Sequence, residues 1–339
     1  MSRIRTVPTL EDVARQAGVS TATVSRCLNS PERVVEQKRV KVMQAVEELG
    51  YTPNFGARAM AAKNTFTIGA IIPTMDNAIF ARGLQAFQEE LHTQGYTLLV
   101  ASSSYRPEIE AEQIRSLVAR GADGLLLIGY TRDPEIYSYL RQREIPTLIA
   151  WAYRNDAEQA CIGFDNRKSM RMLANKVISM GHREIAVISG VVEGNDRAEG
   201  RLQGILDGLR ENGLDPKKTP IIETPYEIEN GAMAFEQFMQ NNTRPTVVMC
   251  GNDVLAAGAL RRAQEMNLSV PEDISITGFD DIELARILTP SLTTVHVPHR
   301  EMGRRAAVEL VKMVKMDSPG VSEQLESSLK VRGSLKALG

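Results

Sequence analysis

Apolar residues recur at helical spacing in three short blocks near the start of the chain. The first block opens on Thr9, has Asp12 in the capping-box position and ends at Gly18. The second spans about residues 21–29 and the third about residues 36–49. The inward-facing positions are Leu10, Val13, Ala14, Ala17, Val19, Val24, Leu28, Val42, Val46 and Leu49. This pattern predicts three short helices around one small core, with only a tight turn between the first two.

The second helix turns small polar side chains outward, although Ser and Thr are poor helix formers. Ser20 caps this helix, and its small side chains allow it to lie deep in the major groove of DNA. Hydroxyls can bond phosphates there, and an arginine can reach a guanine edge. The outward residues are Thr21, Ala22, Ser25, Arg26 and Asn29. The pattern favours a helix-turn-helix that binds DNA; the alternative is a generic three-helix bundle whose second helix is polar.

A linker and then an α/β pattern follow the helical region. Residues 51–65 contain Pro53 and a short Ala-rich stretch, residues 55–62, which predicts a segment that is either disordered or helical. From residue 66 onward, apolar β-rich runs alternate with helical stretches. This alternation predicts parallel sheets with helices on both faces. The apolar runs are residues 66–73, 96–102, 124–129, 145–151, 184–190, 246–251 and 274–280.

The α/β region is long for a single sheet of this kind, so we expect two similar lobes. The chain changes lobe near "GFDN", residues 163–166, and residues 292–298 form a return crossing. A ligand is then expected in the cleft at the carboxyl ends of the strands. The expected fold is therefore an N-terminal all-α helix-turn-helix head followed by a two-lobed α/β core with parallel sheets.

Charge is distributed unevenly along the 339 residues, whose formal net charge is −2. Residues 1–63 hold ten basic and six acidic side chains, a net charge of +4, and the remainder holds 30 and 36, a net charge of −6. A basic head on an acidic body is typical of a head that faces nucleic acid. The three distant cysteines, Cys27, Cys161 and Cys250, indicate reduced thiols in the cytoplasm rather than a disulfide framework.

Several other function classes lack their sequence signatures. The N-terminus has no apolar signal region, and no apolar run reaches the ~18 residues of a membrane span, so we expect a cytoplasmic protein without a membrane partner. The four histidines have no metal-ligand spacing. The sequence also lacks a GxGxxG after the first strand, a Walker loop and a Ser/His/Asp grouping. We therefore expect no metal, no cofactor and no enzymatic activity.

Three motifs carry a family resemblance: "TLEDVARQAGVSTATVSRCLN" (9–29), "ELGYTPN" (48–54) and "GFDD" (278–281). With them the chain resembles the lactose-repressor/galactose-repressor family of bacterial transcription regulators, and its spacings from residue 71 to 130 are similar to gluconate-repressor members. The resemblance implies a core like a periplasmic sugar-binding protein and a homodimer that binds palindromic operator DNA. The implied divisions are a head at 1–50, a hinge at 51–64 and a core at 65–339, with lobe 1 at about 65–164 and 296–325 and lobe 2 at about 165–294 and 326–339.

The resemblance also implies which residues contact DNA. Met60 matches the apolar hinge residue that is wedged into the minor groove. The third helix departs from the family pattern, because Val35 stands where the family has a capping serine and Lys38 where it has a threonine. The first change removes a helix cap, and the second replaces a hydroxyl contact to phosphate by a charge. The matching positions in the second helix are Thr21, Ala22 and Arg26 for bases, and Ser20, Thr23, Ser25 and Asn29 for phosphates or helix orientation.

Effector contacts are implied in the same way. The matching residues are Arg201, which grips the ligand, the polar Asn252 and Asp280, and the aromatic Tyr226 and Phe80. Trp151 follows a predicted strand and is a further candidate for the cleft. One arginine beside an aspartate suits a polyhydroxylated ligand such as a sugar or a sugar acid, and a purine is the alternative with two aromatic side chains.

These observations predict a sequence-specific DNA-binding transcriptional repressor controlled by a small-molecule effector. The effector would shift the population between two arrangements of the lobes. A transport-type sugar-binding protein is the runner-up, but the head motif argues against it. An enzyme of sugar or nucleotide chemistry is a third class, and its site is missing from the sequence.

Overall fold

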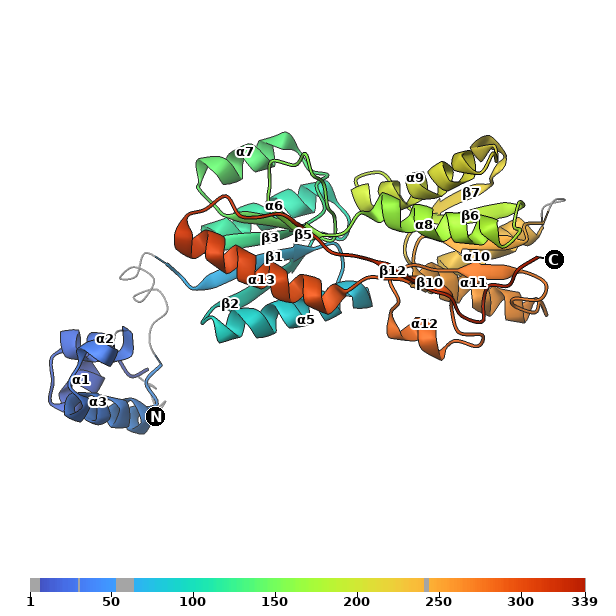
Figure 1. The fold of residues 1–339 in the computed structure, drawn as a ribbon. Coiled ribbons are helices and arrows are strands. Elements are labelled where there is room, and N and C mark those ends of the chain that lie inside the picture. Colours follow the sequence, from blue (N-terminus) through green and yellow to red (C-terminus); the bar gives the residue numbers. More distant parts are fainter. Residues whose placement is uncertain (1–6, 30, 53–63, 241–243, 339) are drawn as a thin grey trace. The chain divides into compact units, whose positions relative to one another are not determined.

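The computed structural model describes residues 7–29, 31–52, 64–240 and 244–338. The chain divides into two compact units, one that ends at Phe66 and one that begins at Thr67. The first unit is helical, and the second alternates strands with helices (Figure 1). Residues 53–63 hold most of the predicted hinge, including Met60, and lie outside the described residues.

The head has the three predicted helices. Thr9 and Asp12 form the capping box of the first helix, and Gly18 ends it in the left-handed conformation, with φ 65°. The Oγ of Ser20 accepts a hydrogen bond from the backbone N–H of Thr23 at 3.2 Å. All the predicted inward positions pack into one apolar core, which also takes in Cys27, so the three-helix prediction is confirmed. The elements are α1 (Leu10–Ala17), α2 (Thr21–Asn29), the 3-10 turn η1 (Pro31–Arg33) and α3 (Glu36–Leu49).

The first lobe of the core is a parallel sheet with the strand order β11-β5-β4-β3-β1-β2. Its strands are β1 (Thr67–Ile72), β2 (Thr97–Ser102), β3 (Gly124–Ile128), β4 (Thr147–Ala150), β5 (Cys161–Gly163) and β11 (Glu323–Gln324). β1 and β3 are buried along their whole length, because helices cover both faces of the sheet. The helices are α5 (Ala78–Thr93) and α13 (His299–Met316) on one face and α6 (Pro107–Ala119) and α7 (Pro134–Gln142) on the other (Figure 1).

The second lobe repeats this plan with the parallel strand order β7-β6-β8-β9. Its strands are β6 (Ile185–Gly190), β7 (Ile221–Thr224), β8 (Val247–Cys250) and β9 (Ser275–Thr277). Helices α8 and α9 pack against each other, and α10 and α11 pack against each other. The helical elements are α8 (Asn166–Ser179), α9 (Asp196–Glu211), η2 (Pro216–Lys218), α10 (Ile228–Met239), α11 (Asp253–Glu265) and α12 (Glu283–Ile287).

Three segments connect the lobes. The chain crosses between β5 and α8, between β10 (Thr294–His296) and α13, and between β11 and β12 (Ser328–Lys330). β10 and β12 pair antiparallel. The buried carboxylate of Asp281 accepts hydrogen bonds from Arg332 at 2.6 Å and from Nδ1 of His296 at 3.0 Å, which ties two crossing segments together. The prediction of a two-lobed α/β core with parallel sheets is confirmed.

Candidate functional site

The outer face of α2 in the head carries small polar side chains and one arginine. Thr21, Ala22 and Arg26 are exposed, whereas Val24 and Cys27 of the same helix are buried in the head core. The hydroxyls of Ser20 and Thr23 lie 2.9 Å apart at the start of the helix. A helix face of this kind presents hydroxyls and a guanidinium to a partner without bulky side chains in front of them.

The remaining predicted DNA contacts have different settings. Ser25 is half-buried on α2, and Lys38 is exposed in the first turn of α3. Val35, at the N-cap of α3, makes no side-chain cap, as the departure from the family pattern predicts. The side chain of Asn29 and all of Met60 lie outside the described residues.

A cavity of about 500 Å³ opens in the core where the strands of both sheets end. It is lined by the segments that follow β1, β2, β6 and β7 and by the first turn of α11, so both lobes contribute to it. This is the carboxyl edge of both parallel sheets, as predicted. The lining residues are Thr74, Asp76, Asn77, Ser104, Tyr105, Val191, Glu193, Asn195, Pro225, Tyr226, Glu227 and Val254.

Two tyrosines, one from each lobe, meet at this cavity. The ring centroids of Tyr105 and Tyr226 lie 6.1 Å apart with the planes tilted by 47°. Gly190 makes room for this arrangement, because a Cβ atom there would lie 2.2 Å from the Tyr226 ring. Burial raises the pKa of both phenols, so both remain hydroxyl donors at neutral pH. The pair forms an aromatic wall with polar edges.

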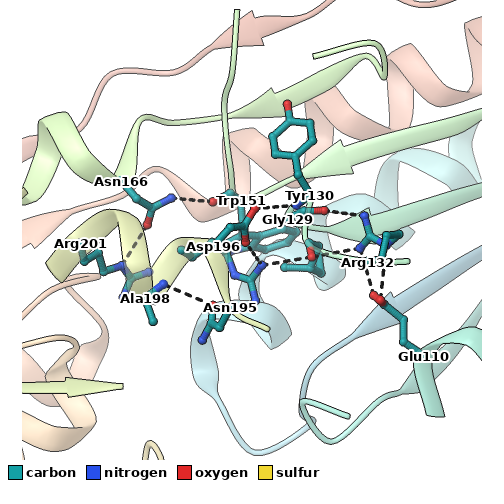
Figure 2. Close-up of polar contacts among 12 residues, drawn as sticks. Glu110, Gly129, Tyr130, Arg132, Trp151, Asn166, Asn195, Asp196, Ala198 and Arg201 are labelled. Carbon is teal, nitrogen blue, oxygen red and sulfur yellow. Dashed lines mark hydrogen bonds and ion pairs between the residues drawn. The ribbon is translucent and has the colours of Figure 1, made fainter. Parts of the chain in front are cut away.

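Arg201 and Asp280 lie close together in the interior of the core. Arg201, on α9, donates to the carbonyl of Gly251 at 2.8 Å, and its guanidinium lies 3.4 Å from a carboxylate oxygen of Asp280. It also donates to Asn166 Oδ1 at 2.9 Å (Figure 2) and lies 4.1 Å above the ring of Phe279. The guanidinium is therefore held by four neighbours in the core.

Asp280 combines burial with an incomplete set of partners. The residue follows β9 with a left-handed backbone, φ 108°, and its Oδ1 has no hydrogen-bond partner among the described residues. Burial raises the pKa of this carboxyl to about 6, although the Arg201 guanidinium opposes the shift. A buried carboxylate oxygen without a hydrogen bond is able to accept one from a ligand hydroxyl.

Of the six predicted effector contacts, only Tyr226 is among the residues that line the cavity. The other five, Arg201, Asp280, Asn252, Phe80 and Trp151, lie outside this lining. Asn252 caps α11, since its Oδ1 accepts from the backbone N–H of Leu255 at 2.9 Å. Phe80 and Trp151 are buried against each other, with ring centroids 5.6 Å apart. The indole of Trp151 donates to Nδ1 of His299 at 3.2 Å. Asn252, Phe80 and Trp151 therefore stabilise the fold in the positions they occupy.

Sequence reasoning missed several residues that line the cavity. Asn77 and Asn195 cap α5 and α9 through their Oδ1 atoms, and Tyr105 follows β2. A signal existed for the asparagines, because each stands between an apolar run and a helical stretch, where a cap is expected. No such signal exists for Tyr105, whose left-handed backbone (φ 58°) is adopted by a residue other than glycine.

Three features bear on alternative chemistry. Among the described residues, no group of three His, Cys, Asp or Glu side chains could hold a metal ion. The described part of the chain also contains no helix with the length and apolar character needed to span a membrane. Cys27, Cys161 and Cys250 are free thiols in the interior.

Comparisons with known protein families match both units. A model described as "Bacterial regulatory proteins, lacI family" matches residues 9–54, and one described as "Periplasmic binding protein-like domain" matches residues 174–335. The HTH-type transcriptional repressor PurR of Proteus mirabilis (strain HI4320) is 36% identical over 302 residues, which cover 88% of each chain.

Solved structures share the same fold. The lac repressor dimer bound to operator and the anti-inducer ONPF is 26% identical, with a TM-score of 0.87 over 98% of this chain and 100% of that one. The transcriptional regulator CelR in complex with cellobiose is 27% identical, with a TM-score of 0.72 over 96% and 99% of the two chains.

Proposed function

We infer that this chain, which belongs to the lacI family of bacterial regulatory proteins, is a transcriptional repressor that binds DNA through its head and responds to a small molecule in its core. The observation that carries the proposal is the outer face of α2, where small side chains surround the exposed Arg26. The cavity between the lobes adds a place for an effector. A DNA-binding head argues against a transport-type binding protein, which does not need to bind DNA. The similar PurR proteins are repressors rather than enzymes.

The proposed DNA contacts are those of the family resemblance. Arg26 reads a guanine edge, and Lys38 contacts a phosphate in place of the hydroxyl that the family has there. Met60 is wedged into the minor groove from the hinge. The remaining contacts are Thr21 and Ala22 to bases, and Ser20, Thr23, Ser25 and Asn29 to phosphates or in orienting the helix.

The effector binds between the tyrosine wall and the interior pair of Arg201 and Asp280. The residues that line the cavity include three carboxylates and no lysine, arginine or histidine. Arg201 is already paired with Asp280. We therefore propose an uncharged polyhydroxylated effector, such as a neutral sugar, ahead of the sugar acid that the sequence also suggested, because an anion would meet like charges. The complex of the similar CelR protein with cellobiose supports this class.

The repressor acts as a homodimer in the cytoplasm. One edge strand of each sheet carries an exposed apolar side chain, Val100 on β2 and Ile221 on β7, and Met233 is exposed on α10. Exposed apolar side chains of this size suit contact with a second copy. The proposed division is a head at 1–50, a hinge at 51–64 and a core at 65–339, with lobe 1 at about 65–164 and 296–325 and lobe 2 at about 165–294 and 326–339.

The test is to select duplex sites from random DNA with the purified full chain and then to challenge the complex. We expect a palindromic site and release, or tighter binding, by one member of a set of neutral sugars, sugar acids and nucleobases. A chain that selects no sequence, while the matched variant Arg26→Ala binds the same DNA equally well, would contradict the proposal. Sedimentation of a monomer at micromolar concentration would contradict the homodimer.

A further inference from the structure

Two neighbouring side chains at the start of α9 reach from the second lobe to the first. The backbone N–H of Tyr130 donates to Oδ2 of Asp196 at 2.6 Å (Figure 2). Arg197 donates to the carbonyl of Ile128 at 3.1 Å and to Oδ1 of Asp196 at 2.8 Å. The contacted residues, 128–130, are the last residue of β3 and the two residues that follow it, and are here called the β3 turn.

The β3 turn is held in place from its own lobe. Arg132, whose side chain is only 2% exposed, donates to the carbonyls of Gly129 at 2.7 Å and Ile128 at 3.3 Å. Glu110 accepts from this guanidinium at 3.0 Å (Figure 2). Two guanidiniums thus converge on the carbonyl of Ile128, and each brings its own carboxylate, so the charges balance locally. The turn is a preformed receptor for the second lobe.

Gly129 supplies the space that the contact needs. Its backbone is left-handed, with φ 70°, and a Cβ atom there would lie 1.9 Å from Nη1 of Arg197 and 2.3 Å from Oδ1 of Asp196. Glycine is the residue that meets both requirements, because it tolerates this φ and has no side chain. The space above Gly129 is filled by the two side chains of the other lobe.

We propose that Asp196 and Arg197 form a latch that holds the two lobes closed over the cavity. Every hydrogen bond that these two side chains make among the described residues goes to the β3 turn or to each other. They therefore contribute to the contact between lobes rather than to the second lobe itself. Both side chains are largely buried, with 21% and 9% of their surface exposed.

The latch lies on the helix that also serves the cavity. Asn195, at the N-cap of α9, lines the cavity, and Arg201 follows one turn after Arg197. Because α9 is one rigid element, a ligand that holds Asn195 and Arg201 in place also favours the latched arrangement. This link to an effector rests on the proposed function. The latch itself does not rest on the proposed function, because its contacts form without a ligand.

Amide hydrogen exchange of Tyr130 in the full chain, without DNA or ligand, tests the latch directly. We expect Asp196→Ala to accelerate exchange of this amide at least tenfold, because its acceptor is removed and the lobes open. Asp196→Asn keeps an acceptor oxygen and should retain most of the protection. The amide of Gly129, which donates to Ala150 within the sheet at 3.0 Å, should be unchanged in both variants.

A matched control lies on the same helix. Asp207 pairs with Arg167 inside the second lobe, so Asp207→Ala should leave the exchange of Tyr130 unchanged. Gly129→Ala changes the first lobe instead of the second: its methyl group would occupy the space of the Asp196 and Arg197 side chains. It should therefore accelerate exchange of the Tyr130 amide as Asp196→Ala does. Protection of the Leu125 amide, near the start of β3, which donates to the carbonyl of Pro146 at 2.9 Å, reports that the first lobe is still folded in this variant.

Two results would overturn the latch: a Tyr130 amide that is equally slow in wild type and Asp196→Ala, or one that is already unprotected in wild type. Neither result affects DNA site selection by the head, so the latch and the proposed function fail separately. A Gly129→Ala chain that keeps Tyr130 protected would also contradict the assignment, because the added methyl group and the latch cannot share one space.

Discussion

Replacing Asp280 by asparagine isolates the electrostatics of the core interior. The carboxyl is buried beside Arg201, and its pKa is raised from the ordinary 3.8 to about 6. A carboxyl whose pKa is higher in the folded than in the unfolded chain stabilises the fold fully below the unfolded pKa. That contribution is lost as the pH rises through the folded pKa. Asp280→Asn removes the titration and leaves the contacts of Arg201 with Asn166 and Gly251.

The size of the effect follows from the two pKa values. The difference between the unfolded pKa of 3.8 and the folded pKa of about 6 makes the folded chain about 3 kcal/mol less stable at high pH than at low pH, since one pKa unit is worth about 1.4 kcal/mol. Roughly half of this, on the order of 1 kcal/mol, is lost between pH 5 and pH 7.5. The loss of a counter-charge for Arg201 in the variant does not depend on pH in this window. The free energy of unfolding of Asp280→Asn, relative to wild type, should therefore rise by on the order of 1 kcal/mol over that window.

The assay is urea denaturation of the full chain at both pH values, followed by the fluorescence of Trp151. This residue is the sole tryptophan of the chain and is buried in the core. Asp207→Asn is the matched control, because Arg167 lowers the pKa of Asp207. The stability that this residue contributes is lost only as the pH falls through its depressed pKa, so its difference from wild type should be flat between pH 5 and 7.5. An equally flat result for Asp280→Asn would refute the reasoning.

Three further changes have defined outcomes. Arg26→Ala should lose ~1–3 kcal/mol of discrimination between a selected site and random DNA, measured by footprinting; equal occupancy of the site would contradict base reading. Val35→Ser should supply the missing cap of α3 and stabilise it by ~1 kcal/mol, read as slower amide exchange in that helix, and unchanged exchange would count against it. Gly190→Ala should displace the ring of Tyr226 and weaken binding of a screened effector at least tenfold by calorimetry, whereas unaltered affinity would remove Tyr226 from the site.

Much of the fold could be predicted because its elements are defined by local patterns. The stripe through Val13, Val24 and Val42 identifies the head core without knowledge of any distant contact. β1 and β3 are continuous apolar runs, as expected of strands covered on both faces. The short strands β5, β7, β11 and β12 were missed, since two to four residues carry no periodicity and their pairing depends on distant parts of the chain.

The site was less predictable than the fold. The proximity of Arg201 and Asp280 could be expected because strand ends of one sheet meet at one edge. The sequence did not predict in which direction each side chain points. Phe80 and Trp151 were expected at the cleft and pack against each other in the interior, and Tyr105 was not expected there and lines the cavity. The linear sequence does not distinguish an aromatic side chain that packs in the interior from one that lines the cavity.

The position of the last segments of the chain has a consequence for synthesis on the ribosome. The first lobe begins at β1, but two of its elements come near the end of the chain. β11 follows β5 by about 160 residues and pairs with it in the register Glu323 to Ile162, and α13 covers one face of the sheet. A nascent chain that has emerged only as far as β10 holds a complete sheet in the second lobe, whereas the sheet of the first lobe lacks β11 and the cover of α13. The first lobe closes its core only when translation is nearly finished, so until then the apolar face that awaits Ala307, Leu310 and Val311 is open to chaperones and to other nascent chains.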